Sequence, residues 1–211
     1  MAIVSTQTTV RSRDGRTTRD ALVTAARRLM EVRGYQNTSL DDVLRESGVG
    51  KGNFYYHFRS KEDLGHAILD QIIGSFLERT LEPCFSDTDG HWLSQIRCFL
   101  SRVLEYQRER KCVGGCAMGN LASELSDVHE GFRARLASVF TAWQERLTLV
   151  LREAQNRGEL VSECQPEGVA HFLVAALEGS ILLSKVTKNI GVMEQCVSEI
   201  ERYLALYEVR S

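Results

Sequence analysis

The side chains best suited to bind another molecule gather between positions 51 and 61. Lys51 can donate hydrogen bonds to guanine O6 and N7, and Asn53 can bond to adenine N6 and N7. Gly52, between them, has no side chain to hold the backbone away from a base pair. These residue types at this spacing predict that Lys51, Gly52 and Asn53 read bases in a DNA major groove.

Hydroxyl and basic side chains around this stretch are suited to bind phosphates. They are Thr38, Ser39, Tyr55, Tyr56, His57 and Lys61. Phosphate contacts set the register of a protein on DNA but do not read its sequence. We therefore expect the base-reading residues to lie within a ring of phosphate contacts.

Two short helices must position these residues. Ser39 and Asp42 form a capping-box-like start, and Gly48 can end that helix in the left-handed conformation. The second helix runs from about Lys51 to Phe58, where two phenylalanines four residues apart can face a core. Helix, glycine turn and helix form a helix-turn-helix, whose second helix can enter the major groove. The alternative is a helical hairpin packed inside an unrelated domain.

This part of the chain resembles a known family. Residues 48–64, GVGKGNFYYHFRSKEDL, are similar to the signature of TetR-family transcriptional regulators, and residues 25–40 resemble that family's first helix. The likeness covers about residues 17–66. It implies base contacts at Lys51, Gly52, Asn53 and Tyr55, and phosphate contacts at Thr38, Ser39, Tyr56, His57 and Lys61. Many members have serine or a similar small polar residue at the position of Gly50, so its glycine would remove one phosphate contact.

Composition favours an all-α chain. Of 211 residues 43% are hydrophobic, only two are proline, and no long alternation typical of strands occurs. We expect about nine helices, arranged as a three-helix head that a long helix joins to a ligand-binding and dimerisation body. The expected domains are a disordered arm at 1–16, a helix-turn-helix domain at 17–62 and the body at 63–211. Alternatively, the arm touches DNA through Arg11, Arg13 and Arg16.

Charge is distributed unevenly along the chain. Residues 1–61 hold 11 Lys and Arg against 6 Asp and Glu, a net charge of +5, whereas the remainder carries −7. A basic head on an acidic body suits nucleic acid at one end. A solvated surface can show the same bias.

The six cysteines predict free thiols in a reducing cytoplasm, because no secretory signal precedes them. Cys112 and Cys116 form the only close pair, and their spacing is poor for zinc, so no metal or cofactor is expected. No apolar run reaches the length of about 20 residues that a membrane span needs. The predicted location is the cytoplasm, without membrane contact.

The body contains two helices of particular interest. A long helix continues from Ser60 to about Glu82, where Pro83 is expected to break it, and its tilt can move the head. A helix opened by Pro166 is almost entirely apolar, so a second copy is expected to cover one side. The TetR resemblance implies a homodimer on the last two helices that reads a palindromic DNA operator. The predicted dimer contacts are Leu177, Ile181, Lys185, Val197 and Ile200; a buried monomer helix is the alternative.

A small-molecule inducer is expected to bind within the body, as the resemblance implies. Aromatic groups with a few polar ones suit such a site. The candidates are Trp92, Phe99, Cys116, Asn120, Phe140, Trp143, His171, Phe172 and Glu178. Glu178 is the most unusual, because it lies on an apolar helix and needs a partner such as a ligand or Lys185. Plain core packing is the alternative for each of them.

Cys116 could act as a sensor of electrophiles or oxidants. It begins a Gly-Cys-x-x-x-x-Leu-x-x-Glu segment that resembles one TetR subgroup, some of whose members respond through that cysteine. A helix N-terminus and the nearby charges of Arg108, Arg110 and Lys111 would lower its pKa. The alternative is a small, packed residue at a tight helix start.

Enzymatic function is not expected. A phosphate loop would need glycine at Arg45, a G-x-G-x-x-G loop fails at Asn53, and neither H-E-x-x-H nor G-x-S-x-G occurs. A helical adaptor that binds protein instead of DNA is a remote alternative. We therefore predict a sequence-specific DNA-binding regulator, a repressor that a small-molecule inducer releases from its operator; a thiol sensor acting through Cys116 is the alternative on the same scaffold.

Overall fold

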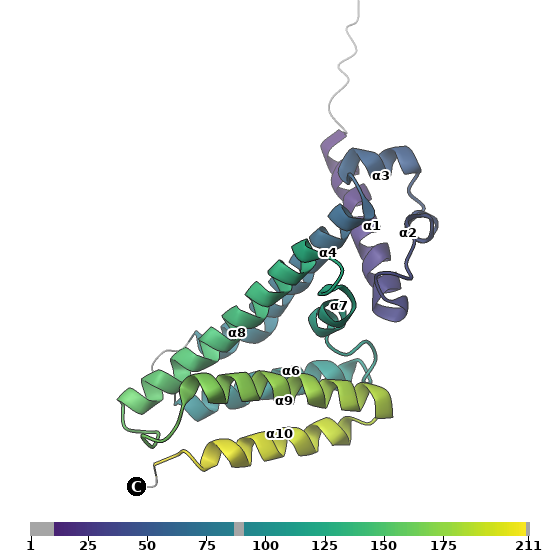
Figure 1. Ribbon diagram of the computed structural model, residues 1–211. Helices are drawn as coiled ribbons and strands as arrows, with labels where there is room; N and C mark the ends of the chain where they lie inside the picture. Colours follow the sequence, from purple (N-terminus) through teal and green to yellow (C-terminus); the bar gives the residue numbers. More distant parts are fainter. Residues whose placement is uncertain (1–10, 87–90, 210–211) are drawn as a thin grey trace, which may run out of the picture. The chain divides into compact units, whose positions relative to one another are not determined.

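The computed structural model describes residues 11–86 and 91–209, which form two compact units (Figure 1). The first unit ends at Asp70 and the second begins at Gln71, within helix α4. Helices dominate both units, and the only strand-like pairing among the described residues is an isolated bridge between Leu160 and Glu208. The predicted all-α class is therefore confirmed.

Four helices build the first unit: α1 (Arg11–Arg33), α2 (Leu40–Ser47), α3 (Lys51–His57) and most of α4 (Lys61–Phe76). Their apolar side chains meet in a small core of Leu22, Ala26, Tyr35, Val43, Phe54, Phe58 and Leu64, each at most 5% exposed. Helix α1 begins at Arg11, so residues 11–16 of the expected disordered arm are helical. The rest of that arm lies outside the described residues.

The helical path that begins with α4 continues past Pro83 without a break, contrary to the prediction. It passes into a π-helical turn, η1 (Leu77–Leu81), and then into α5 (Glu82–Phe85). The π register moves the bond of the Glu82 N–H to the Leu77 carbonyl, five residues back. Pro83 lies in the first turn of α5, where its missing N–H costs little.

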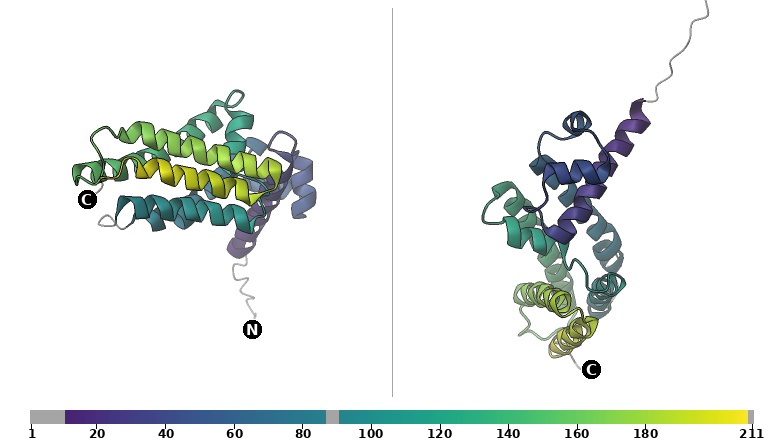
Figure 2. Two further views of the ribbon diagram at one scale, coloured as in Figure 1. Left: turned by 90° about the horizontal axis from the view of Figure 1, so that it is seen from below. Right: turned by 90° about the vertical axis from the view of Figure 1, so that its right-hand side faces the viewer.

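The second unit also contains α6 (Trp92–Glu109), α7 (Ala117–Leu125), α8 (Glu130–Asn156), α9 (Pro166–Thr187) and α10 (Ile190–Ala205). Helix α10 packs against both α9 and α6, and α8 packs against α9 (Figure 2). By length and composition α9 could cross a membrane. Its contacts with α8 and α10 account for the apolar residues on one side of it as those of a core helix.

One pair of cysteines contradicts the expectation of free thiols. Cys84 of α5 and Cys98 of α6 form a disulfide. The remaining cysteines, Cys112, Cys116, Cys164 and Cys196, are free. Sequence spacing could not reveal the pair, because the two residues meet only when α5 packs against α6.

Candidate functional sites

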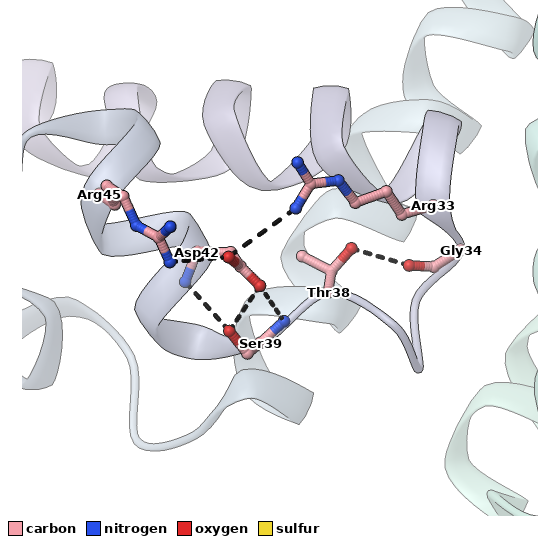
Figure 3. A network of polar contacts seen from close by, with 6 residues as sticks. All are labelled: Arg33, Gly34, Thr38, Ser39, Asp42 and Arg45. Carbon is pink, nitrogen blue, oxygen red and sulfur yellow. Dashed lines mark hydrogen bonds and ion pairs between the residues drawn. The ribbon is translucent and has the colours of Figure 1, made fainter.

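A polar network at the start of α2 fixes the helix-turn-helix (Figure 3). The Ser39 hydroxyl accepts the Asp42 N–H at 3.1 Å, and the Asp42 carboxylate accepts the Ser39 N–H at 3.2 Å, which completes a capping box. Arg45 donates to the same carboxylate at 2.9 Å, and Arg33 lies 3.8 Å from it. Hydrogen bonds from Ser39 are the main cause that lowers the pKa of Asp42, so the carboxylate stays charged.

Thr38 cannot make the predicted phosphate contact with its side chain. It is fully buried, and its hydroxyl donates to the Gly34 carbonyl at 2.8 Å (Figure 3). The hydroxyl thus satisfies a carbonyl at the end of α1, where helices leave acceptors unpaired. Sequence reasoning missed this role, because a threonine before a helix can either contact a phosphate or bond to a carbonyl of the preceding helix.

Helix α3 presents the predicted base-reading residues on one exposed surface. Phe54 is fully buried, whereas Lys51, Gly52 and Asn53 are exposed and Tyr55 is 52% exposed. Gly48 adopts φ +68° to end α2, which places the start of α3 three residues later. The exposed side chains therefore surround the N-terminus of α3, where hydrogen-bond donors and the helix dipole favour negatively charged partners.

The predicted phosphate contacts lie beside this surface. Tyr56 is 82% exposed, and the half-buried His57 lies edge-on to its ring with centroids 4.9 Å apart. Lys61 already has partners, because its Nζ lies 4.4 Å from the centre of the Tyr35 ring and donates to the Gln36 carbonyl at 3.4 Å. These contacts hold the Lys61 ammonium at a defined place on the surface of the head.

The second unit holds a half-buried group of polar side chains at the start of α7. Cys116 caps this helix, and its sulfur accepts the Gly119 N–H at 3.3 Å. The Glu178 carboxyl of α9 lies close enough to the Cys116 thiol for each to shift the pKa of the other. Glu178 approaches the helix closely, since a Cβ added at Gly119 would lie 2.5 Å from its Oε2 atom. Burial raises the pKa of Glu178, which favours the neutral acid.

The predicted lowering of the Cys116 pKa is wrong. Burial, and then the neighbouring charge of Glu178, raise the pKa of this thiol well above its usual range. The cations expected to lower it have other partners: Arg108 pairs with Glu194 and Glu105, and Arg110 donates to the Val113 carbonyl. A helix N-terminus alone does not offset the loss of water around a thiolate.

Further hydrogen bonds hold the loop before α7 against α6 and α9. Lys185 donates to Asn120 Oδ1 at 3.0 Å, so its partner is Asn120 and not the predicted Glu178. Asn120 donates to the Gly114 carbonyl at 2.6 Å, and Gln107 donates to the Gly115 carbonyl at 3.4 Å. Within the described part of the chain, the buried Oε1 atoms of Glu178 and Gln107 have no hydrogen-bond partner.

The structure brings together only part of the predicted inducer site. Trp143 contacts both Phe99 and Phe140, with ring centroids 5.5 and 5.9 Å apart, and it also contacts Phe76 at 4.7 Å. Trp92 lies at the opposite end of α6 from Gln107, about 22 Å away at 1.5 Å per residue. It therefore cannot share a small site with Cys116.

His171 and Phe172 do not belong to an internal site. Both are exposed, and Phe172 packs on Tyr203 of α10 with ring centroids 4.7 Å apart. They lie on the side of α9 that faces away from Leu173 and Val174 in the core. An apolar helix gives no periodic signal from which its buried side can be read.

Most of the predicted dimer contacts are wrong for the same reason. Leu177, Ile181, Val197 and Ile200 are at most 8% exposed within a single chain and belong to its own core. Lys185 is half-buried and engaged with Asn120. A second copy cannot cover side chains that the chain itself already covers.

Sequence reasoning missed Gln107 and Gly119 as parts of the polar group. A signal existed for both. Gln107 follows Val103 by one helical turn on the apolar side of α6, where a polar residue is unusual. Gly119 follows Cys116 by three residues within a helix, where glycine is unfavourable unless another group approaches closely.

Comparisons with known proteins agree with this architecture. Residues 22–68 match the family model described as bacterial regulatory proteins, tetR family, and residues 93–200 match that of the tetracyclin repressor-like C-terminal domain. An HTH-type transcriptional regulator encoded in the lacX 3′ region of Lactococcus lactis subsp. lactis is 34% identical over 179 residues, covering 85% of this chain and 89% of the relative.

The HTH-type transcriptional repressor DhaR of Mycobacterium sp. strain GP1 is 28% identical over 182 residues, which cover 86% of this chain and 89% of that protein. A TetR transcriptional regulator from Chloroflexus aurantiacus J-10-FL has a similar structure, with a TM-score of 0.84 and 28% identity, over 93% of this chain and 98% of that one. Regulators of this family bind DNA operators, typically as homodimers with small-molecule ligands, and are generally not enzymes. The chain belongs to the TetR family of bacterial regulatory proteins and is a DNA-binding transcriptional repressor.

Proposed function

We propose that this repressor acts in the cytoplasm as a homodimer and leaves a palindromic operator when a small-molecule inducer binds its body. The exposed surface of α3 carries the DNA part of this proposal. Lys51, Gly52, Asn53 and Tyr55 would contact bases there, with the buried Phe54 behind them. Ser39, Tyr56, His57 and Lys61 would contact phosphates. Thr38 is no longer a candidate, because its side chain is buried.

Operator binding tests these contacts. Tyr55→Ala should weaken binding to the promoter of its own gene by about 1–3 kcal/mol, the range for one good base contact. Lys61→Ala should weaken binding to all duplexes and lower the salt dependence by about one phosphate. Tyr106→Ala is a matched control, because Tyr106 is also an exposed tyrosine but lies on α6 of the body. Undiminished binding by both head variants would refute the assigned contacts.

The dimer proposal now depends on a different side of α9. Apolar or small residues that are exposed, or half-buried in the case of Gly179, follow one another at alternating intervals of three and four, which is the spacing of a helix-packing seam. They are Phe172, Ala175, Gly179, Leu182 and Val186. We expect a second copy to cover this stripe, because the side chains of Leu182 and Val186 are 58% and 73% exposed in one chain.

A charge within the stripe tests this. Val186→Glu should convert the dimer to monomers in sedimentation velocity, because an unpaired carboxylate would be buried. Val32→Glu places the same charge at a valine that is 77% exposed on α1, and it should leave the dimer intact. A Val186→Glu protein that remains dimeric would move the interface elsewhere.

The inducer would bind near the buried group of Cys116, Asn120 and Glu178, with Phe99, Phe140 and Trp143 as aromatic candidates. The Oε1 atom of Glu178 supports this, because it is buried without a hydrogen-bond partner among the described residues. Such an atom can accept a hydrogen bond from a ligand, which would favour one conformation of the body over another. Glu178→Gln should change inducer sensitivity but not operator affinity in the absence of inducer; unchanged sensitivity would exclude Glu178.

Covalent modification of Cys116 is the second candidate. The half-buried thiol lies beside Glu178, whose carboxyl group can accept the thiol proton only once it has itself ionised. Because the thiol pKa is raised, the reaction should be slow near neutral pH and accelerate as pH rises. Cys116→Ser should abolish operator release by methylglyoxal or a quinone. Release that persists in this variant would leave reversible binding as the mechanism.

A further inference from the structure

The disulfide at the end of the long helix has no role in the DNA-binding or inducer proposals. Helix α4 passes without a gap into η1 and α5, and Cys84 of α5 is bonded to Cys98 of α6, 14 residues later in the chain. Cys84 is 5% exposed, whereas Cys98 is half-buried. The bond thus ties the end of a helix that starts in the head to the core of the body.

A second contact joins the same two elements. Arg102 of α6 donates to the Arg79 carbonyl of η1 at 2.9 Å. In an α-helix this carbonyl would accept an N–H from residue 83, but Pro83 has none. Cys98 and Arg102 are four residues apart, so they lie on one side of α6. We call these two residues the α6 clasp.

The clasp holds the part of the helix whose hydrogen-bond register is unusual. In η1 the Glu82 N–H bonds to the Leu77 carbonyl, five residues back. A change to the α register would rotate α5 by one residue, about 100°, relative to α4. That rotation would carry Cys84 away from α6, so the disulfide opposes it. Single π turns inside α-helices frequently occur at functional sites.

We propose that the Cys84–Cys98 pair is a redox lock on the α4–η1–α5 helix: the oxidised pair holds the π register, and the reduced pair lets this segment change register. The inference rests on the proposed repressor function. A repressor occupies its operator in the resting cell, and the proposed cytoplasmic compartment is reducing. The reduced protein is therefore the operator-bound form, and oxidation releases it.

A low-molecular-weight disulfide is a sufficient oxidant. The Cys98 thiolate, on the more accessible side, attacks one sulfur of RS–SR and expels RS⁻. The Cys84 thiolate then attacks the Cys98 sulfur of the mixed disulfide and expels the second RS⁻. Each expelled thiolate takes up one proton that a cysteine released, so two RSH form as the protein loses two electrons. A dithiol reverses both steps.

The test compares two redox states of the full-length protein. One sample is treated with oxidised glutathione and one with dithiothreitol, and mass spectrometry of peptides confirms the state of the pair. Operator affinity is measured by fluorescence anisotropy with the promoter duplex. We expect the reduced protein to bind about 10-fold more tightly, within the usual range of allosteric coupling. Equal affinity in the two states would overturn the regulatory role.

Variants identify the responsible cysteines. Cys98→Ser, and independently Cys84→Ser, should bind like the reduced protein under both treatments. Cys196→Ser keeps the pair and should respond like the wild type. Circular dichroism verifies folding, and the half-buried Cys98 is the milder site to change. A response that is lost in Cys116→Ser but kept in Cys98→Ser would refute the lock.

Hydrogen exchange separates failure of the lock from failure of the repressor proposal. Amides of residues 77–86 should exchange faster in the reduced protein and in Cys98→Ser, because the segment is then held by packing and hydrogen bonds without a covalent tie. If neither redox state binds DNA, the operator proposal fails, yet faster exchange would still support the lock. Unchanged exchange would overturn the lock whatever the DNA result.

Discussion

The starts of α2 and α7 use the same local device with opposite electrostatic results. At each, a side chain caps the helix by accepting an N–H three residues on: Ser39 from Asp42, and Cys116 from Gly119. Beside the surface cap, the pKa of Asp42 falls; beside the buried cap, the pKa of Glu178 rises. Hydrogen bonds dominate the first shift and desolvation the second, so burial and not capping decides which charge state is stable.

This difference suits the tasks of the two units. The α2 network lies at the surface, where Ser39 and two arginines satisfy one carboxylate, and it holds the helix-turn-helix in one geometry. The α7 network keeps a neutral acid and a thiol inside the body. Placing a charge on either group there costs more free energy than at the surface. A rigid DNA-binding unit and a body that responds to a bound ligand are expected in a ligand-controlled repressor.

The closeness of Glu178 to α7 predicts the largest effect on stability. Gly119→Ala should lower the free energy of unfolding by about 1–2 kcal/mol, because the new methyl group would push the Glu178 carboxyl, the end of a flexible side chain, away from α7. Gly52→Ala is the matched control in α3, where a Cβ meets nothing within 4 Å and alanine favours the helix. Urea denaturation measures both. If Gly119→Ala is as stable as the control, the close approach is not maintained in solution.

The surface cap should contribute less. Ser39→Ala should cost about 1 kcal/mol, because the Asp42 N–H at the start of α2 loses the hydroxyl that accepts it. Thermal unfolding of this variant is compared with that of Ser198→Ala, an exposed serine within α10 that caps no helix. Equal melting temperatures would show that Arg33 and Arg45 alone suffice to hold Asp42.

Glu178 should give the body a pH-dependent stability. Its folded pKa is raised above 4.5, so its contribution is fully present below that pH and is lost as pH rises through the folded pKa. Glu178→Gln should remove this decline and flatten the profile of unfolding free energy above pH 5. Glu109→Gln, at an exposed position on α6, should retain the wild-type profile. A decline that survives in Glu178→Gln belongs to another group.

Asp42 should give the smallest effect, with the opposite sign. Its folded pKa is lowered below 3.8, so its contribution is present above that pH and is lost as pH falls through the folded pKa. Asp42→Asn should therefore reduce the acid-induced loss of stability below pH 4. Acid titration followed by circular dichroism measures this change. An identical acid transition in the variant would mean that the network is fully screened by water.

The head was more predictable from the chain than the body. The capping pair Ser39 and Asp42, the turn at Gly48 and the buried pair Phe54 and Phe58 are local features whose spacing dictates their geometry. Predictions for the body failed where distant elements meet. Examples are the Cys84–Cys98 bond and the raised pKa of Cys116, which is caused first by burial and then by a carboxyl 62 positions away along the chain.

Local pattern alone was sufficient for the all-α class, the helix-turn-helix and the family, because short-range periodicity, caps and glycine turns encode them. Long-range packing decided which side of α9 is buried. Ile181 and Leu182 are equally apolar neighbours, yet the first is 2% exposed and the second 58%. Hydropathy cannot separate such residues, since their difference arises from neighbouring elements, chiefly α8 and α10, which cover one side of the helix and leave the other open.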